Sequence, residues 1–406
     1  MRACVVGSGG REHALALALG RTAEVVVTPG NPGIPGSVPA PPEEIDADLF
    51  VIGPEQPLVD GLADRLRAQG GRVLGPGADG ARLEGSKAFM KEVVGDAGVP
   101  TARHGVFADV KPALAFLRTL PGLYVVKTDG LAAGKGVLVT ESLDEAADDV
   151  RAKLSGSSFG DAGRTVVIEE GLLGPEVSIF AICDGTEAVA LPPAQDFKRV
   201  GDGDTGPNTG GMGAWSPVPF AGADLAEVAV ERFVGPTLAE LRSRGIDYRG
   251  VLYAGMILTL DGPKLIEFNI RFGDPDSQVV LLRLTSDLTE LLAAAADGEL
   301  RRAGPVATSP DARVLVVAAS EGYPASPRTG DLIDGLDSAR AVDGVDVLCA
   351  GVSADGEGRL VTAGGRVLDV IGRGPDAAAA RARAYEAVAH ISWPGLHHRT
   401  DIAAAR

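Results

Sequence analysis

The segment at 264–276, KLIEFNIRFGDPD, restricts the fold of this chain more than any other stretch. It begins with apolar residues and then alternates polar and apolar side chains, which predicts a β-strand with one buried face. Successive side chains of a strand point to opposite faces, so Glu267, Asn269 and Arg271 share one face and the apolar residues between them face the core. An Asp-Gly pair just before this strand predicts a tight hairpin turn from an apolar strand at 251–259.

The polar face of this strand has the chemistry of a metal and phosphate site. Glu267 and Asn269 offer oxygen ligands of the kind that Mg²⁺ takes, and Mg²⁺ commonly binds phosphate oxygens as well. The guanidinium of Arg271 can hold a phosphate or a carboxylate through two hydrogen bonds. The alternative interpretation is the solvated face of an edge strand, where glutamate and arginine are common.

The overall composition argues against several classes of protein. A length of 406 residues predicts two to four domains. A formal net charge of −17 disfavours a nucleic-acid-binding protein, which would present a basic face. The three cysteines are scattered without metal-ligand spacing, which is typical of a reducing compartment. No apolar stretch is long enough to cross a membrane, so we expect a cytoplasmic protein that binds neither nucleic acid nor membranes.

The domain organisation follows from changes in pattern along the chain. Short apolar strands alternate with helical segments near the N-terminus, which predicts a parallel sheet covered by helices. After Gly304 short strands predominate. We therefore predict a multidomain protein of α/β and α+β class, with an N-terminal α/β domain at 1–90, a central domain at 91–300 and a small β-rich C-terminal domain at 301–406. A smaller subdomain is expected at about 106–173.

Three further segments have distinct patterns. One helix is predicted at 58–69, and another begins at Asp224 and runs to about Arg244 with a kink at Pro236. The segment at 201–213 consists almost entirely of Gly, Asp, Thr, Asn and Pro, which predicts a loop too long to be a mere connection.

The glycine-rich turn at 7–13, GSGGREH, resembles a dinucleotide-binding fingerprint only in part. That fingerprint needs glycine where Glu12 stands and an acidic residue near Thr28, so a nicotinamide cofactor is disfavoured. A phosphate role remains open because the turn begins a helix, whose free N–H groups attract anions, and Arg11 adds positive charge. The alternative is a tight strand–helix turn without a ligand.

A second glycine-rich stretch, KTDGLAAGKGV at 127–137, departs from the P-loop, which has four residues between its glycines and a hydroxyl residue after its lysine. Its small residues would let the backbone close over phosphates that Lys127 could reach. A structural hairpin is the alternative. Farther along, Glu176 could bind ribose hydroxyls beside a linker whose backbone could contact adenine, although solvated acidic residues would look the same.

Four motifs resemble the ATP-grasp superfamily and occur in its order: KTDGLAAGKGV (127–137), VIEEGLLGPEVS (167–178), QDFKRVGDGDTGPNTGGMGAWSP (195–217) and IEFNIRFGDPDSQ (266–278). Within that superfamily they are similar to the phosphoribosylamine–glycine ligase family. GSGGREHAL, TPGNPG, GPEQPLVDG and LEGSKAFMK resemble its N-terminal part, and TGD and GGRVLDV its C-terminal part. The resemblance covers nearly the whole chain and implies a central ATP-grasp fold with the 106–173 subdomain as a lid.

The resemblance also implies an activity. The expected reaction joins glycine to 5-phosphoribosylamine through glycyl phosphate and forms glycinamide ribonucleotide, ADP and phosphate, the second step of de novo purine biosynthesis. The expected partners are these small substrates, with Mg²⁺ or Mn²⁺ as the cofactor, and the expected state is a monomer.

Residue roles are carried over from the matching motifs. Arg271 and Lys127 are the expected catalytic residues, and Glu267 and Asn269 the expected metal ligands. The expected ATP site is Lys87, Lys127, Gly134, Lys135, Gly136, Glu169, Leu172 and Glu176, with Glu169 and Leu172 presenting backbone groups to adenine. The expected glycine site is Asp196, Lys198, Asn208, Gly210, Gly211 and Met212. The expected phosphoribosylamine site is Gly9, Gly10, Arg11, Asn31 and Glu55.

The chain departs from the family pattern in a few places. The short, Pro-rich segment at 34–48 replaces a strand and a helix, so we predict a missing or stunted helix on the N-terminal sheet. Thr128, Ile270 and Asp276 stand where the family usually has Ala, Cys and Glu. The alternatives are a ligase for another amino acid or carboxylate, a nicotinamide-dependent oxidoreductase, and a non-catalytic nucleotide-binding protein.

Overall fold

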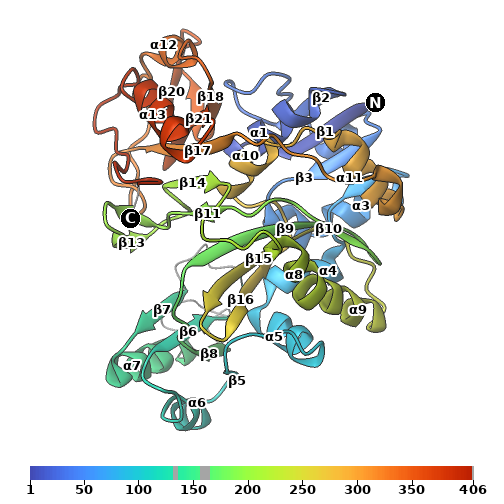
Figure 1. Ribbon diagram of the computed structural model, residues 1–406, viewed down its shortest axis with the longest axis vertical. Helices are drawn as coiled ribbons and strands as arrows, with labels where there is room; N and C mark the ends of the chain where they lie inside the picture. Colours follow the sequence, from blue (N-terminus) through green and yellow to red (C-terminus); the bar gives the residue numbers. More distant parts are fainter. Residues whose placement is uncertain (131–135, 156–164, 405–406) are drawn as a thin grey trace.

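The computed structural model describes residues 1–130, 136–155 and 165–404, and it places a small lobe at one end of a larger body (Figure 1). The N-terminal sheet is wholly parallel, with the order β2-β1-β3-β4. Its strands are β1 (Arg2–Gly7), β2 (Glu24–Pro29), β3 (Leu49–Ile52) and β4 (Val73–Leu74). Its helices are α1 (Gly10–Leu19), α2 (Glu55–Val59), α3 (Leu62–Ala68) and α4 (Ala78–Gly85), and α5 (Lys87–Asp96) follows. This confirms the predicted parallel α/β domain.

Two predictions for this region had different outcomes. The helix predicted at 58–69 is instead two helices, because Gly61 adopts a left-handed conformation (φ 75°) between α2 and α3. The segment at 34–48 contains only a single 3₁₀ turn, η1 (Pro42–Glu44), which agrees with the predicted loss of a helix.

The central sheet is antiparallel, with the order β10-β9-β15-β16. Its strands are β9 (Glu176–Asp184), β10 (Ala188–Ala190), β15 (Arg249–Thr259) and β16 (Gly262–Asn269). The hairpin predicted before 264–276 is thus confirmed. The helical elements around it are α8 (Leu225–Ala229), η3 (Val230–Val234), α9 (Gly235–Ser243), α10 (Asp276–Leu281), α11 (Leu288–Asp297) and η4 (Leu300–Ala303).

The long helix predicted from Asp224 to Arg244 is interrupted as expected near its proline. Residues Val230–Val234 form a π-helical turn directly before Gly235 and Pro236. Because proline has no N–H to continue the α-helical hydrogen bonds, the wider turn accommodates it.

The small lobe contains the antiparallel sheet β5-β8-β6-β7 and its own apolar core. Its elements are β5 (His104–Phe107), α6 (Val110–Leu117), β6 (Tyr124–Thr128), β7 (Val137–Thr140), α7 (Leu143–Leu154) and β8 (Val166–Glu170). Figure 1 shows this lobe set apart below the body. A separate core allows the lobe to move as a unit, and we refer to it as the lid.

The C-terminal sheet combines strands from two distant parts of the chain, in the order β11-β14-β17-β21-β18. Two come from the central region, β11 (Gln195–Asp196) and β14 (Gly213–Ser216), and three from the C-terminal region, β17 (Ala312–Ala319), β18 (Val345–Cys349) and β21 (Arg366–Gly374). The remaining elements there are α12 (Leu336–Arg340), β19 (Val352–Ala354), β20 (Leu360–Thr362) and α13 (Ala377–Val388).

The segment at 201–213, which was predicted to be a loop, is largely a hairpin. Strands β12 (Arg199–Gly201) and β13 (Thr205–Asn208) pair with each other in a two-stranded sheet. Gly203 and Asp204 in the turn and Gly206 after it adopt positive φ angles. The glycine-rich composition therefore allows the tight turn of the hairpin. Among the described residues, no helix is long and apolar enough to cross a membrane.

Candidate active site

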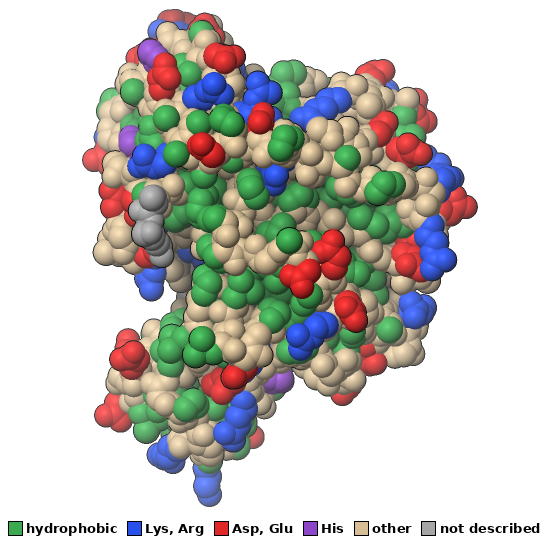
Figure 2. All heavy atoms as spheres, viewed as in Figure 1, with side chains coloured by type: hydrophobic (Ala, Val, Ile, Leu, Met, Phe, Trp, Pro, Cys, Tyr) green, Lys and Arg blue, Asp and Glu red, His purple; other side chains and the backbone are tan. Residues whose placement is uncertain are grey.

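A large cavity of about 1880 Å³ lies between the lid and the body. Figure 2 shows the corresponding hollow beside the lower lobe. The lining comes from the lid, the central sheet, the N-terminal helices and the C-terminal region. These sequence-predicted residues line the cavity: Arg11, Glu55, Lys87, Lys127, Gly136, Glu169, Leu172, Glu176, Asp196, Lys198, Asn208, Gly210, Glu267, Asn269 and Arg271.

Strand β16 presents its polar face to this cavity, as the period-two pattern predicts. Glu267, Asn269 and the following Arg271 all line it. Phe268 and Ile270 are 2% and 1% exposed, although Phe268 also contributes to the lining. β16 is an edge strand of its sheet, as the alternative of a solvated edge strand expects, but the three polar side chains line the cavity. A β-bulge in the pairing with β15 inserts Ile266 as an extra residue beside Glu267, and Ile266 also lines the cavity.

Glu267 is surrounded by positive charge. Burial disfavours its charged form, but Lys127, Lys198 and Lys87 outweigh burial and hold the pKa of Glu267 below its usual value. The carboxylate is therefore ionised at neutral pH and can serve as an anionic oxygen ligand. Asn269 adds an amide oxygen, Oδ1, which lies 3.3 Å from an Nη atom of Arg271.

Arg271 is held in place by two carboxylates from the N-terminal helices. Its Nη2 atom lies 2.9 Å from Oε1 of Glu84, and its Nε atom lies 3.4 Å from Oε2 of Glu55. The other carboxylate oxygen of Glu84 accepts a hydrogen bond from the backbone N–H of Ile270 (2.9 Å). Glu55, expected to bind phosphoribosylamine, thus contacts Arg271, the expected catalytic residue. Glu84 also lines the cavity, and the sequence analysis did not identify it.

A buried ion-pair triad joins the lid to the body at the back of the cavity. Glu169 on β8 forms ion pairs with Lys127 on β6 (2.9 Å) and with Lys91 on α5 (3.1 Å). Lys91 also donates to Thr101 (2.8 Å), which in turn donates to the carbonyl of Leu265 on β16 (2.7 Å). The two lysines hold the pKa of Glu169 below its usual value against the effect of burial.

The position of Glu169 does not suit its expected backbone contact with adenine. The residue lies inside the central strand of the lid sheet, opposite His104 on one side and Val125 on the other. Beyond the end of that strand, Gly171 donates to the carbonyl of Leu123 (2.8 Å), whereas the N–H of Leu172 finds no partner within the described part of the chain. Leu172 is therefore free for the expected contact.

Lys87 begins helix α5 beneath the lid. The side chain of Ser86 caps this helix by accepting from the N–H of Phe89 (3.1 Å). The Lys87 ammonium donates to the carbonyl of Gly130 (2.9 Å), at the edge of the lid loop. Burial lowers the pKa of Lys87, which makes the gain from an anionic ligand larger. Gly134 and Lys135, two expected ATP-binding residues, lie outside the described residues.

A second polar group lies where the cavity meets β9 and β11. Lys198 forms an ion pair with Glu176, so the expected glycine and ribose residues contact each other. Burial raises the pKa of Asp196 and that of Asp276 above their usual values. Asp276 is 3% exposed, and its Oδ1 atom has no hydrogen-bond partner among the described residues. The positive charge of Lys198 acts on both Asp196 and Asp276 and opposes the effect of burial on their pKa values.

Five predicted site residues do not line the cavity, namely Gly9, Gly10, Asn31, Gly211 and Met212. Met212 is fully buried in the core. The Asn31 amide donates to the carbonyls of Ser8 (2.7 Å) and Ala350 (3.0 Å), so it links the first turn to the C-terminal region. Gly9 donates its N–H to Glu12 (2.6 Å). The contacts of Asn31 and Gly9 are made within the protein, and the predicted ligand roles of these five residues remain predictions.

Arg366, from the C-terminal strand β21, was also missed as a site residue. It lines the cavity, lies 3.2 Å from the Asp274 carboxylate and donates to the carbonyl of Gly210 (2.8 Å). Its motif was visible in the sequence, but only the fold brings it to this position. Among the described residues, no group of three or more His, Cys, Asp or Glu is arranged to hold a metal ion. Glu267 and Asn269 supply carboxylate and amide oxygen atoms, which is a set compatible with a cation that takes its other ligands from phosphate and water.

Comparison with known proteins gives a consistent result. Three family models match, described as the N domain (residues 1–84), the ATP-grasp (A) domain (residues 85–277) and the C domain (residues 313–405) of phosphoribosylglycinamide synthetase. The phosphoribosylamine–glycine ligase of Streptomyces coelicolor is 49% identical over 100% of this chain and 99% of its own. That of Caulobacter vibrioides is 47% identical over 98% and 96%.

Solved structures agree with the sequence relatives. The crystal structure of phosphoribosylamine–glycine ligase from Thermotoga maritima matches with a TM-score of 0.87 and 34% identity, over 99% of this chain and 100% of that one. A biotin carboxylase domain of the 2-oxoglutarate carboxylase from Hydrogenobacter thermophilus matches with a TM-score of 0.73 at 16% identity, over 98% and 91%. The latter likeness concerns the fold alone.

Proposed function

Because the chain belongs to the phosphoribosylglycinamide synthetase family, we propose that its cavity joins glycine to 5-phosphoribosylamine at the expense of ATP. The observation that carries this assignment is the arrangement of Lys127, Lys87 and Arg271 around Glu267 in one cavity between lid and body. Such a cluster neutralises a polyphosphate while retaining anionic and amide oxygens for a cation.

The chemistry requires two displacements. A carboxylate oxygen of glycine attacks the γ-phosphorus of ATP, and the bond from that phosphorus to the ADP oxygen breaks, giving glycyl phosphate. The amine of phosphoribosylamine then attacks the acyl carbon, the bond to the phosphate oxygen breaks, and the amine loses a proton as the amide forms. Because phosphate leaves far more readily than oxide, the first step makes the second feasible. The protein contributes mainly position and charge.

The proposed residue roles are those that the family resemblance implies for residues lining the cavity. Lys87 and Lys127 neutralise the ATP phosphates, and Arg271 faces the transferring phosphoryl group or the glycine carboxylate. The N–H of Leu172 contacts adenine, and Glu176 takes the ribose. Asp196 and Lys198 hold glycine together with the Asn208–Gly210 segment, while Arg11 faces phosphoribosylamine.

Glu267 and Asn269 would hold Mg²⁺ or Mn²⁺. A divalent ion held there would supply positive charge that offsets the negative charge of the phosphates during transfer. The donor set fits, because it supplies one ionised carboxylate and one amide oxygen and leaves other positions for phosphate and water.

The decisive experiment measures ADP release with ATP, phosphoribosylamine generated in situ, and each amino acid in turn. We expect rapid release with glycine and little with alanine or serine. Omission of phosphoribosylamine serves as the control. Equal rates with alanine or serine would identify a ligase for another amino acid and overturn the glycine assignment.

A further inference from the structure

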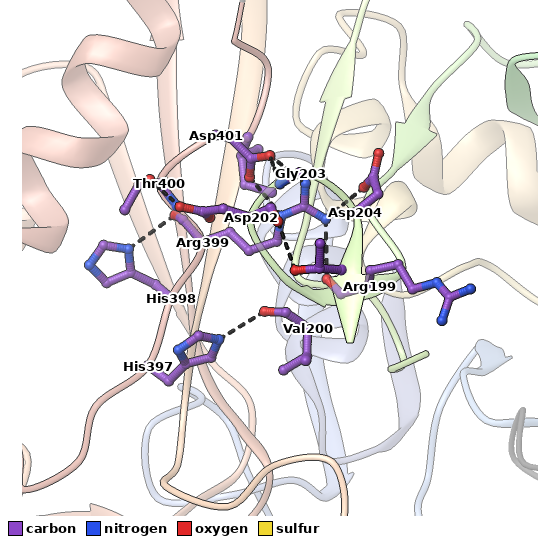
Figure 3. Close-up of polar contacts among 12 residues, drawn as sticks. Arg199, Val200, Asp202, Gly203, Asp204, His397, His398, Arg399, Thr400 and Asp401 are labelled. Carbon is purple, nitrogen blue, oxygen red and sulfur yellow. Dashed lines mark hydrogen bonds and ion pairs between the residues drawn. The ribbon is translucent and has the colours of Figure 1, made fainter. Parts of the chain in front are cut away.

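The C-terminal segment at 397–401 contacts the β12–β13 hairpin through the fully buried side chain of Arg399 (Figure 3). Arg399 donates two parallel hydrogen bonds to the carboxylate of Asp401, both of 2.7 Å. Its remaining Nη1 atom donates across to the hairpin, to Oδ1 of Asp204 (2.8 Å) and to the carbonyl of Arg199 (3.1 Å). One guanidinium therefore joins the first strand and the turn of the hairpin to the C-terminal segment.

Neighbouring residues repeat this connection. The N–H of Thr400 donates to Asp202 (2.8 Å), and the N–H of Gly203 donates to Asp401 (2.8 Å). On the other side, Nε2 of His397 lies 2.8 Å from the carbonyl of Val200. Figure 3 shows these contacts lining up along the turn of the hairpin. The segment at 397–401 thus contacts the hairpin from its first strand through its turn.

The hairpin is only partly buried, with Val200 packed against the hydrophobic core. It forms a two-stranded sheet of its own, and the residues at 202–208 are exposed. An isolated hairpin is marginally stable in water, so its position depends on the groups that hold it. Its exit is held at Gly210, which donates to the hydroxyl of Tyr323 (2.9 Å) and accepts from Arg366. Those two residues also belong to the C-terminal region.

The hairpin is directly connected to the cavity. Arg199, Asp204 and Asn208 line it, and Asp196 and Lys198 lie immediately before the first strand. The Arg399 guanidinium lies 5.2 Å from the ring centroid of Phe197, the residue between them. A displacement of Arg399 would therefore be transmitted to the expected glycine pocket.

We propose that Arg399 is a positioning residue that sets the place of the β12–β13 hairpin and thereby shapes the glycine end of the cavity. This inference rests on the proposed function, because it takes glycine as the ligand of that end. A planar guanidinium suits the task, since it reaches Asp401, Asp204 and a carbonyl at once. A lysine ammonium cannot reproduce this fork.

The test compares Arg399→Lys with a matched control, Arg313→Lys. Arg313 is a similarly buried arginine of the C-terminal sheet, paired with Asp346 (2.6 Å), and it does not line the cavity. In Arg399→Lys we expect kcat/KM for glycine to fall about 10- to 100-fold, as for a slightly misplaced substrate site, with the KM for ATP nearly unchanged. Asp204→Asn should act in the same direction with a smaller effect. Arg313→Lys should leave both constants near wild type.

Hydrogen exchange of the full-length protein without substrates supplies a readout independent of catalysis. We expect amides at 199–211 to exchange at least about tenfold faster in Arg399→Lys than in Arg313→Lys, with similar melting temperatures. Unchanged exchange, or faster exchange without an effect on glycine, would overturn the proposal. A wild-type protein whose ADP release does not depend on glycine would instead overturn the proposed function. The exchange data would still show whether Arg399 holds the β12–β13 hairpin in place.

Discussion

Lys91 and Glu169 form an ion pair of 3.1 Å that joins helix α5 of the body to strand β8 of the lid, with the lysine side chain fully buried. Lys91→Met would remove one of the two cations that hold the Glu169 carboxylate. We expect a loss of about 2 kcal/mol in the free energy of unfolding, as for a hydrogen bond to a charged group, and a several-fold rise in the KM for ATP because Lys127 loses its fixed partner.

Lys264 provides the control for this prediction. It also connects β16 to the lid strand, but through a 3.7 Å contact with Glu170 and with a more exposed side chain. Lys264→Met should lower the free energy of unfolding by no more than about 1 kcal/mol, as for a surface ion pair. Equal effects of the two substitutions on unfolding and on ATP would contradict a special role for the buried pair.

Glu267→Gln keeps the size of the side chain and removes its charge. We expect kcat to fall about 10²- to 10³-fold, as for loss of one group that stabilises developing charge, while ATP still binds through the surrounding lysines. Turnover and nucleotide binding should be measured separately, with the exposed Glu357→Gln as the control. Wild-type turnover in Glu267→Gln would eliminate the proposed metal site.

The sequence predicted this part of the site well, because alternation along one strand is a local property. Glu267, Asn269 and Arg271 were placed correctly from their spacing alone. The bulge that turns Ile266 into the cavity depends on pairing with β15 and leaves no local signal. The partnership of Lys91 with Glu169 likewise depends on how lid and body meet. The same limit applies to the segment at 201–213, whose composition predicted a loop although the structure has a hairpin.

Gly10→Ala should destabilise the contact between the N- and C-terminal parts. A Cβ atom at Gly10 would lie 1.9 Å from Oδ2 of Asp369 on β21 and 3.2 Å from the Gln278 amide. We expect this overpacking to lower the free energy of unfolding by about 1–3 kcal/mol. Gly95→Ala in helix α5 is the matched control, since nothing lies within 4 Å of its added Cβ. It should stabilise the protein by about 0.5–1 kcal/mol. A thermal melt in which both variants match wild type would refute the predicted clash.

Acidification should weaken the protein through His13. This residue is buried on α1 and its Nδ1 atom accepts from the N–H of Cys349 (2.9 Å), and burial lowers the pKa of His13 to about 4. The unfolded chain takes up a proton near pH 6.5, before the folded protein does. Stability should therefore fall as the pH drops from about 6.5 to about 4, by on the order of 3 kcal/mol.

His13→Asn tests this dependence, because the asparagine oxygen can still accept the hydrogen bond without titrating. The difference in unfolding free energy between pH 7 and pH 4.5 should shrink in this variant. His390→Asn, at an exposed position, should leave the difference unchanged. An identical pH dependence in wild type and His13→Asn would show that other groups control acid stability.

The C-terminal sheet contains strands from both the central and the C-terminal region, which limits where recombination can divide the chain. Strand β14 pairs with β17 across the gap between the matched ATP-grasp and C domains, so neither part holds a complete sheet. A gene fragment beginning at residue 305 would encode β17 with one edge bare, and a fragment ending there would leave β14 without its neighbour. The segments matched by the ATP-grasp and C-domain family models are thus not independent folding units. A functional chimera of two relatives should therefore take β11 and β14 from the same parent as the C-terminal strands.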